Sequence, residues 1–144
     1  MFEIIDHTAD VAFVVKAQDE RSLIKDALDA LHYIYFEKLP DRSDNSEKRT
    51  VKVEGINLED AIISFLNEIV YIFDSQKLVF SGVQDIDVFY REDGEVVIES
   101  QLLFSKFSPE KHNPVIYVKA VTYGGANIKR DENNNLQMTL IVDI

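Results

Sequence analysis

The sequence contains no cysteine, which excludes disulfide bonds and zinc sites built on thiolates. It also lacks any stretch rich in proline, glycine and serine that would separate two folded units, and it has no internal repeat. A chain of 144 residues is long enough to bury a stabilising hydrophobic core without disulfide bonds or a structural zinc ion. We therefore expect a single domain spanning residues 1–144.

Long hydrophobic runs are missing as well. Nothing approaches the ~18 consecutive apolar residues that a membrane-spanning helix requires. The first apolar stretch is interrupted by Asp6, His7 and Asp10, which argues against a signal peptide. These two absences predict a cytoplasmic protein without a membrane partner.

Positive charge is scarce: 15 Lys and Arg stand against 26 Asp and Glu, a formal net charge of −11. Strong direct binding to nucleic acid is disfavoured, because such binding depends on cationic side chains that displace counterions from phosphates. Divalent cations or a basic protein partner are favoured instead. The alternative is that the acidic surface only keeps the protein soluble.

Two segments carry the apolar spacing of amphipathic helices. The first is predicted from about Glu20 to Phe36, with Asp19 as its N-cap. The second follows Asn57, which occupies the N-cap position, and Asp60 three residues later forms a variant of the capping box. Its aromatic residues recur at helical spacing and are expected to belong to the core.

The remainder of the chain has the β-branched and alternating pattern of strands. Asp93-Gly94 predicts a hairpin turn, and the polar segment Pro40–Arg49 predicts a loop. The fold class expected is α+β, with two main helices packed on one face of a mostly antiparallel β-sheet. The expected strands are Val11–Ala17, Thr50–Glu54, Leu78–Phe80, Val83–Tyr90, Glu95–Phe104, Val115–Ile128 and Leu136–Ile144.

Familiar catalytic signatures are absent from the sequence. There is no nucleophile elbow, no phosphate-binding loop of the Walker type and no His-Glu-x-x-His motif. The histidines His7, His32 and His112 are scattered over different elements and make a poor zinc site without cysteine. His32 lies near the apolar stripe of the first helix, where a hydrogen-bonded, partly buried histidine is expected.

Carboxylates offer a better candidate site. "DHTAD" at residues 6–10 joins two short apolar runs, and Asp143 is the single charge in the apolar final strand "LQMTLIVDI". Ile144 adds the α-carboxylate of the chain. Oxygen ligands of this kind suit calcium or magnesium, and Asp6 or Asp10 would complete a site if the turn lies beside the last strand. The alternative is a frayed, solvated chain end.

Lys119 interrupts a segment that is otherwise apolar and aromatic. Its side chain either extends to water from the edge of the sheet or forms a fixed cation beside the acidic cluster. In the second case it is placed to meet a phosphate or a carboxylate of a partner.

Three motifs in this order, "DHTAD" near the start, "KAVTY" at residues 119–123 and "VDI" at the end, resemble the archease family. The segments "VEGINLEDAIISFLNEIVYIFDSQKLVF" and "FSPEKHNPVIYVKAVTY" are similar to the same family. The resemblance implies an activator of the RNA ligase that joins a 3′-phosphate or 2′,3′-cyclic phosphate end to a 5′-hydroxyl in tRNA splicing and RNA repair. Such a protein promotes guanylylation and multiple turnover of the ligase and is not itself an enzyme.

The resemblance also assigns residues. It implies that Asp10, Asp143 and the terminal carboxylate of Ile144 bind a divalent cation, Ca²⁺ or Mg²⁺, and that Lys119 is critical for activation. Asp6 and His7 belong to the first motif and are expected to support the ligands from outside the coordination sphere. Two residues depart from the family pattern, Ala12 and Gly124. The second changes the partner-facing surface beside Lys119 relative to that pattern.

Two other functions remain open from the sequence. One is a chaperone-like modulator of RNA-modifying enzymes that carries a structural metal ion. The other is a stand-alone hydrolase that uses Asp10 and His7 as an acid–base pair.

Overall fold

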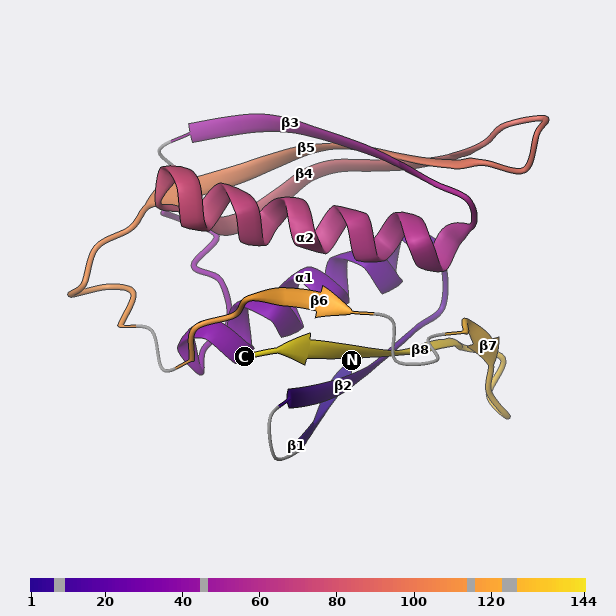
Figure 1. Ribbon diagram of the computed structural model, residues 1–144, viewed down its shortest axis with the longest axis horizontal. Helices are drawn as coiled ribbons and strands as arrows, with labels where there is room; N and C mark the ends of the chain where they lie inside the picture. Colours follow the sequence, from indigo (N-terminus) through magenta and orange to yellow (C-terminus); the bar gives the residue numbers. More distant parts are fainter. Residues whose placement is uncertain (7–9, 45–46, 114–115, 123–126) are drawn as a thin grey trace.

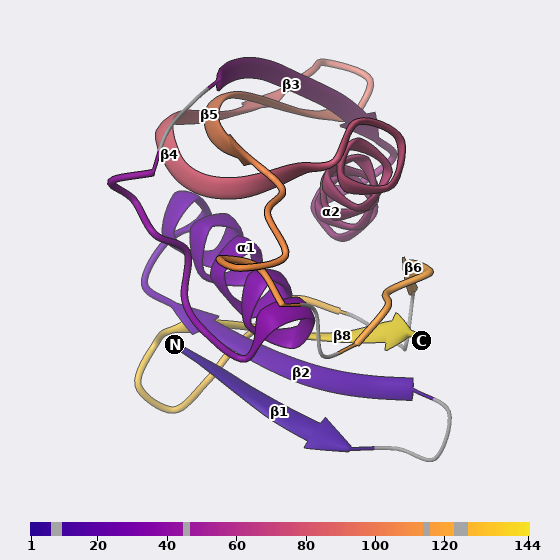
Figure 2. The same cartoon turned by 90° about the vertical axis from the view of Figure 1, so that its left-hand side faces the viewer.

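The computed structural model describes residues 1–6, 10–44, 47–113, 116–122 and 127–144. The described residues form two helices and eight strands, arranged in two antiparallel sheets with the helices between them (Figures 1 and 2). Among these described residues, neither helix combines the length and apolarity needed to cross a membrane.

The first sheet contains both ends of the chain. Its strand order is β1-β2-β8-β6, and the short β7 also pairs with β8. The strands are β1 Phe2–Asp6, β2 Asp10–Ala17, β6 Ala120–Thr122, β7 Lys129–Arg130 and β8 Leu136–Asp143.

The second sheet has the order β3-β5-β4 and forms the opposite layer. Gly94 at a φ of 91° closes the predicted hairpin turn between β4 and β5. The strands are β3 Glu47–Gly55, β4 Leu78–Tyr90 and β5 Val96–Lys106.

Helix α1, Glu20–Phe36, has the predicted bounds and N-cap. The Asp19 carboxylate accepts a hydrogen bond from the Ser22 amide at 2.8 Å, which satisfies a free donor of the first turn. Its apolar stripe packs on β2 of the first sheet and also contacts β4 of the second, so α1 bridges the two layers.

Helix α2, Leu58–Gln76, begins at the predicted cap. Asn57 accepts from the Asp60 amide at 2.8 Å, and the Asp60 carboxylate accepts from the Ile56 amide at 3.0 Å, one residue before the cap. Gly55 lets β3 approach this first turn closely, because a Cβ there would lie 2.4 Å from the backbone nitrogen of Ala61. The aromatic residues Phe65 and Phe73 are buried in the core, as expected, but the same expectation is wrong for Tyr71, which is 60% exposed because it lies on the outer side of the helix.

The fold class is confirmed, with one difference of arrangement. The strands are divided between two sheets, so that the helices are covered on both sides rather than on one. A further strand, β1, was not among those expected. It pairs along its whole length with β2 and extends the first sheet at the edge remote from β6.

Two predicted boundaries in the second sheet are corrected by the structure. β3 begins at Glu47, so the predicted loop Pro40–Arg49 is too long at its end. Leu78–Tyr90 is one strand instead of two, because irregularities in register around Gly82 and between Val83 and Asp85 let it continue through the small residues. Both errors place a boundary where a polar or small residue interrupts an otherwise extended segment.

The long strand predicted over Val115–Ile128 is wrong for the part that is described. Only Ala120–Thr122 is strand, while the Ile116 amide bonds to the Tyr35 carbonyl at the end of α1 at 3.5 Å. Val118 is fully buried. Ile116 and Val118 therefore pack with the core outside any strand, whereas Ala120–Thr122 pairs with β8; Val115 and residues 123–126 lie outside the described residues.

Candidate functional site

Asp10 and Asp143 lie directly opposite each other at the end of the first sheet. The register of β2 and β8 pairs Asp10 with Asp143 and Val11 with Val142. Both valines are buried toward the helices, so the alternation of a strand directs both aspartates to the outer face. Directly opposite residues in an antiparallel pair have Cβ atoms about 4.5–5.5 Å apart, which places the two carboxylates within reach of one ligand.

The end of the chain is fixed beside this pair. The backbone oxygen of Asp143 accepts a hydrogen bond from the Lys119 amide at 2.8 Å, and Ala120 pairs with Asp143 in the β6–β8 register. The partly buried side chain of Ile144 packs against the hydrophobic core. The last strand is therefore paired along both of its edges. The terminal carboxylate belongs to Ile144, whose side chain is packed against the core.

The electrostatics of the pair favour a cation. Two like charges directly opposite on a sheet destabilise it, and within the described part of the chain no basic side chain forms an ion pair with Asp10 or Asp143. Lys119 is exposed beside them. In the same described ranges, no three side chains of His, Cys, Asp or Glu gather as a metal site.

The other residues of the predicted site are placed only in part. Asp6 is the last residue of β1, and its Cα pairs with that of Val11, next to Asp10 in the chain. His7 lies outside the described residues, as does Gly124. Ala12, the other departure from the family pattern, is buried in β2 two residues after Asp10. The ligand roles themselves remain a prediction.

Asn67 of α2 is a contributor that the sequence analysis missed. Its side-chain amide donates to the carbonyl of Val121 at 2.9 Å and accepts from the Val121 amide at 2.8 Å. The other edge of Val121 pairs with β8. Asn67 thus replaces a neighbouring strand at the free edge of β6 and fixes the segment that carries Lys119. The one available signal was a polar amide next to the apolar stripe of α2.

The two described histidines line a cavity of about 320 Å³, and neither Asp10 nor Asp143 is among its lining residues. His32, buried as expected, donates from Nδ1 to the Lys38 carbonyl at 2.6 Å, and burial lowers its pKa to about 4. His112 accepts at Nδ1 from the Ser108 amide at 3.0 Å, which assigns its proton to Nε2. Nε2 lies 3.4 Å from Ser105 Oγ and carries no free lone pair in this tautomer, so His112 is not arranged as a base for that serine.

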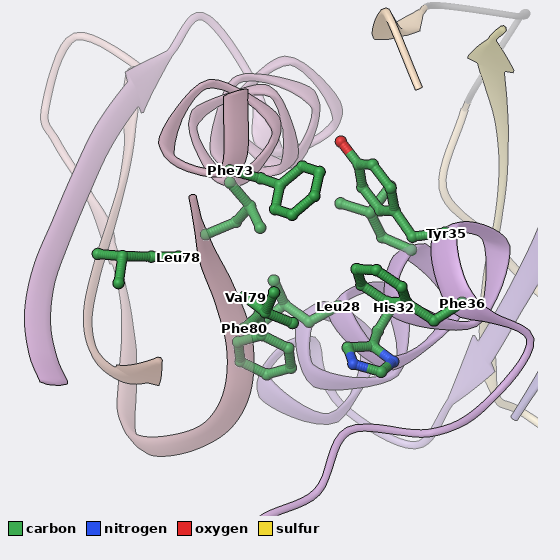
Figure 3. A pocket seen from close by; sticks show the side chains of 10 residues that line it. Leu28, His32, Tyr35, Phe36, Phe73, Leu78, Val79 and Phe80 are labelled. Carbon is green, nitrogen blue, oxygen red and sulfur yellow. The ribbon is translucent and has the colours of Figure 1, made fainter. Parts of the chain in front are cut away.

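A second cavity lies among apolar side chains between the helices and β4 (Figure 3). It measures only about 20 Å³, room for little more than one water molecule. Leu28, Phe73 and Phe80 line it together with Tyr35, whose hydroxyl is directed away from His32 and Phe80. This space is a packing gap of the core and offers no ligand site.

Fold and site together define a small α+β protein in which strands from the two ends of the chain, β2 and β8, place Asp10 opposite Asp143. We call these two residues and their strand ends the acidic strand pair. The family described as "Archease protein family (MTH1598/TM1083)" matches residues 2–144, and the chain belongs to the archease family. The resemblance drawn from the three sequence motifs is thereby confirmed.

Named relatives and a solved structure agree with this assignment. The chain is 30% identical over 146 residues to the protein archease of Pyrococcus furiosus, covering 99% of this chain and 98% of that one. It is 29% identical to protein archease of Sulfurisphaera tokodaii, with the same coverage, and 27% identical to a protein archease-like of Dictyostelium discoideum, covering 99% and 93%. The solution structure of Methanobacterium thermoautotrophicum protein 1598 has the same fold, with a TM-score of 0.79, 23% identity and coverage of 99% and 98%.

Proposed function

We propose that this protein activates an RNA ligase of the 3′-phosphate/5′-hydroxyl joining type, promoting its guanylylation and multiple turnover in tRNA splicing and RNA repair. The protein is an activator and not itself the catalyst. Membership of the archease family supports the ligase as partner. The observation that carries the proposal on this chain is the cross-strand pairing of Asp10 with Asp143 beside the docked C-terminus.

The donor set fits a hard divalent cation, Ca²⁺ or Mg²⁺. Asp10, Asp143 and the terminal carboxylate of Ile144 would hold it, because all three offer oxygen and together supply about three negative charges. A bound ion would offset the repulsion between the two opposed aspartates and offer positive charge to a phosphate oxygen. The residues of the chain orient these ligands: β2 and β8 fix the aspartates, and the core holds Ile144.

Lys119 is the second functional group of the proposed site. Its amide is bonded to Asp143, and its exposed side chain starts next to the acidic pair. A fixed ammonium group here would help to orient a nucleotide triphosphate in the partner's active site, since nucleotidyl transfer depends on positioning and charge neutralisation. The net charge of −11 agrees with a protein partner and disfavours strong direct binding to nucleic acid.

Guanylylation of the cognate ligase, followed with labelled GTP, tests the proposal. Asp10→Asn, Asp143→Asn and Lys119→Ala should each reduce the stimulated rate about tenfold or more, because each removes charge from the proposed site. Glu92→Gln is the matched control. Glu92 is exposed in the turn between β4 and β5, at the opposite end of the molecule from the C-terminus (Figure 1).

Unfolding midpoints of the same variants separate activation from stability. In the presence of a chelator the three site variants should be at least as stable as the control, because Asp10→Asn and Asp143→Asn each remove one of two opposed negative charges. With the ion present, a chaperone-like protein with a merely structural ion would instead lose stability in parallel with activity when Asp10 is replaced. Phosphoester turnover without any ligase would identify a hydrolase and overturn the proposal.

A further inference from the structure

Asp74 is an acidic residue that forms no ion pair within the described part of the chain and lies in an unfavourable position. It lies in the last turn of α2, where the helix dipole disfavours negative charge and where no basic residue is present. Its Oδ1 is buried, and within the described part of the chain this oxygen has no hydrogen-bond partner. The unpaired buried oxygen costs stability unless a donor approaches, and the negative charge at this end of the helix costs stability unless a positive group approaches.

Two tyrosines from other elements are affected by the charge of this carboxylate. Tyr35, only 4% exposed, lies at the end of α1, and its hydroxyl also lacks a partner among the described residues. Burial, followed by the nearby carboxylate of Asp74, raises the pKa of Tyr35. The same carboxylate raises the pKa of Tyr117, which precedes β6. Asp74 therefore stands close to both phenols, with hydrogen-bonding capacity left unused on two of the three groups.

Two large aromatic side chains are exposed at the same place. Tyr117 is 61% exposed, and Tyr71, one helical turn before Asp74 on the same face of α2, is 60% exposed. Tyrosine is enriched in protein interfaces, where its ring supplies contact area and its hydroxyl a hydrogen bond. Figures 1 and 2 show that the C-terminal end of α2, the segment before β6 and the C-terminus all lie at one end of the molecule. A partner that covers the acidic strand pair would be adjacent to these residues.

We propose that Tyr71, Asp74 and Tyr117 form a docking surface for a lysine or arginine side chain of the partner ligase. This inference rests on the proposed function, because it takes the ligase as the partner. A guanidinium or ammonium group placed here would pair with Asp74, neutralise charge at the negative end of α2 and lie against exposed tyrosine rings. The surface contributes binding of the partner and takes no part in the chemistry at the acidic strand pair.

The chemistry of the surface selects a basic side chain over other ligands. One carboxylate is too few for a divalent cation, which needs several oxygen ligands. A phosphate or RNA backbone would be repelled by Asp74 and by the net charge of −11. A donor-rich cation matches a carboxylate flanked by aromatic rings, and charge-assisted bonds of this kind are stronger than neutral ones.

The test is a guanylylation titration of the ligase with increasing activator, from which the half-maximal concentration and the maximal rate are obtained separately. Asp74→Asn, which keeps the shape and removes the charge, should raise the half-maximal concentration about tenfold and leave the maximal rate unchanged. Tyr117→Ala should act in the same direction. Glu68→Gln, at an exposed acidic position of the same helix, should change neither value.

Unfolding measurements exclude a purely structural role. Asp74→Asn should unfold at the same or a higher denaturant concentration than the wild type, because the charge it removes is uncompensated; Tyr35→Phe should likewise not destabilise. Equal half-maximal concentrations for Asp74→Asn and Glu68→Gln would overturn the inference while leaving the proposed function intact. Wild-type protein that fails to stimulate the ligase at any concentration would instead overturn the proposed function.

Discussion

Asn67 and Val121 are joined by two hydrogen bonds, one in each direction, between a helical side chain and the backbone of a short strand. The strand is β6, whose other edge pairs with β8, and β8 in turn pairs with β2. A continuous set of contacts therefore runs from α2 through the Lys119 segment to Asp143 and Asp10. Proper placement of the proposed activating lysine depends on this helix as much as on the sheet.

Replacing Asn67 tests that dependence. Asn67→Ala leaves the amide and carbonyl of Val121 without partners and should cost about 1–3 kcal/mol of unfolding free energy. Ligase stimulation should fall further than the stability loss explains, because the Lys119 segment is released. Asn57→Ala removes the cap of the same helix at a similar cost, about 1 kcal/mol, without touching β6. Equal stimulation by the two variants at matched folded concentration would show that Asn67 has no positioning role.

The free carboxylate at Ile144 provides a second prediction. Converting it to a C-terminal amide removes one negative charge from the proposed ligand set and adds no bulk. Stimulation of the ligase should drop sharply, while the unfolding midpoint in chelator barely changes because the Ile144 side chain still packs on the core. An amidated protein that stimulates the ligase fully would remove the terminal carboxylate from the site.

Stability should fall in mild acid because His32 is buried in its neutral form. Burial lowers its pKa from 6.5 to about 4 in the folded protein, so the unfolded chain binds the proton first as pH falls. The contribution of His32 to the free energy of unfolding is fully present above pH 6.5 and is lost as the pH falls from 6.5 to 4. The loss is on the order of 3 kcal/mol for this group. Burial also lowers the pKa of His112, which contributes in the same direction.

Urea unfolding at pH 7.5, 5.5 and 4.5 checks this dependence. His32→Asn offers a donor to the Lys38 carbonyl without a titrating ring, so its stability should change less over the same range. Parallel losses of stability in the wild type and His32→Asn would assign the acid sensitivity to other groups.

Gly55 should be intolerant of any side chain. A Cβ at this position would lie 2.4 Å from the nitrogen and 2.7 Å from the Cα of Ala61, both backbone atoms in the first turn of α2. Gly55→Ala is therefore expected to cost about 1–3 kcal/mol or more of unfolding free energy. Gly82→Ala is the control, since the nearest atom to its Cβ would be a Leu103 methyl at 3.6 Å. Denaturant titration that found the two variants equally stable would contradict this account of the β3–α2 turn.

The helices were predictable because their evidence is local. Apolar residues at helical spacing and the caps Asp19 and Asn57 determine each start without reference to the rest of the chain. The outward direction of Asp143 also follows from simple alternation in the last strand. The segment around Val118 was mistaken for a strand because its apolar residues are buried against helices, and burial alone does not distinguish the two arrangements.

The sequence allowed the residues of the site to be predicted, but not the strand pairing that brings them together. Motif resemblance selected Asp10 and Asp143, but their pairing depends on which strands become neighbours and in what register, and that is decided by long-range packing. The roles given to Asn67 and Asp74 were not visible in the sequence. Each acts through a contact, or the lack of one, with residues 39 or more positions away in the sequence.

The central claim is that the two ends of the chain hold one divalent cation, and calorimetric titration with Ca²⁺ and Mg²⁺ tests it most directly. The wild type and Glu92→Gln should bind one ion per chain with the same affinity, and Asp10→Asn and Asp143→Asn should each weaken binding about tenfold or more. Affinity that is unchanged in Asp143→Asn, or no binding of either ion by the wild type, would contradict the claim.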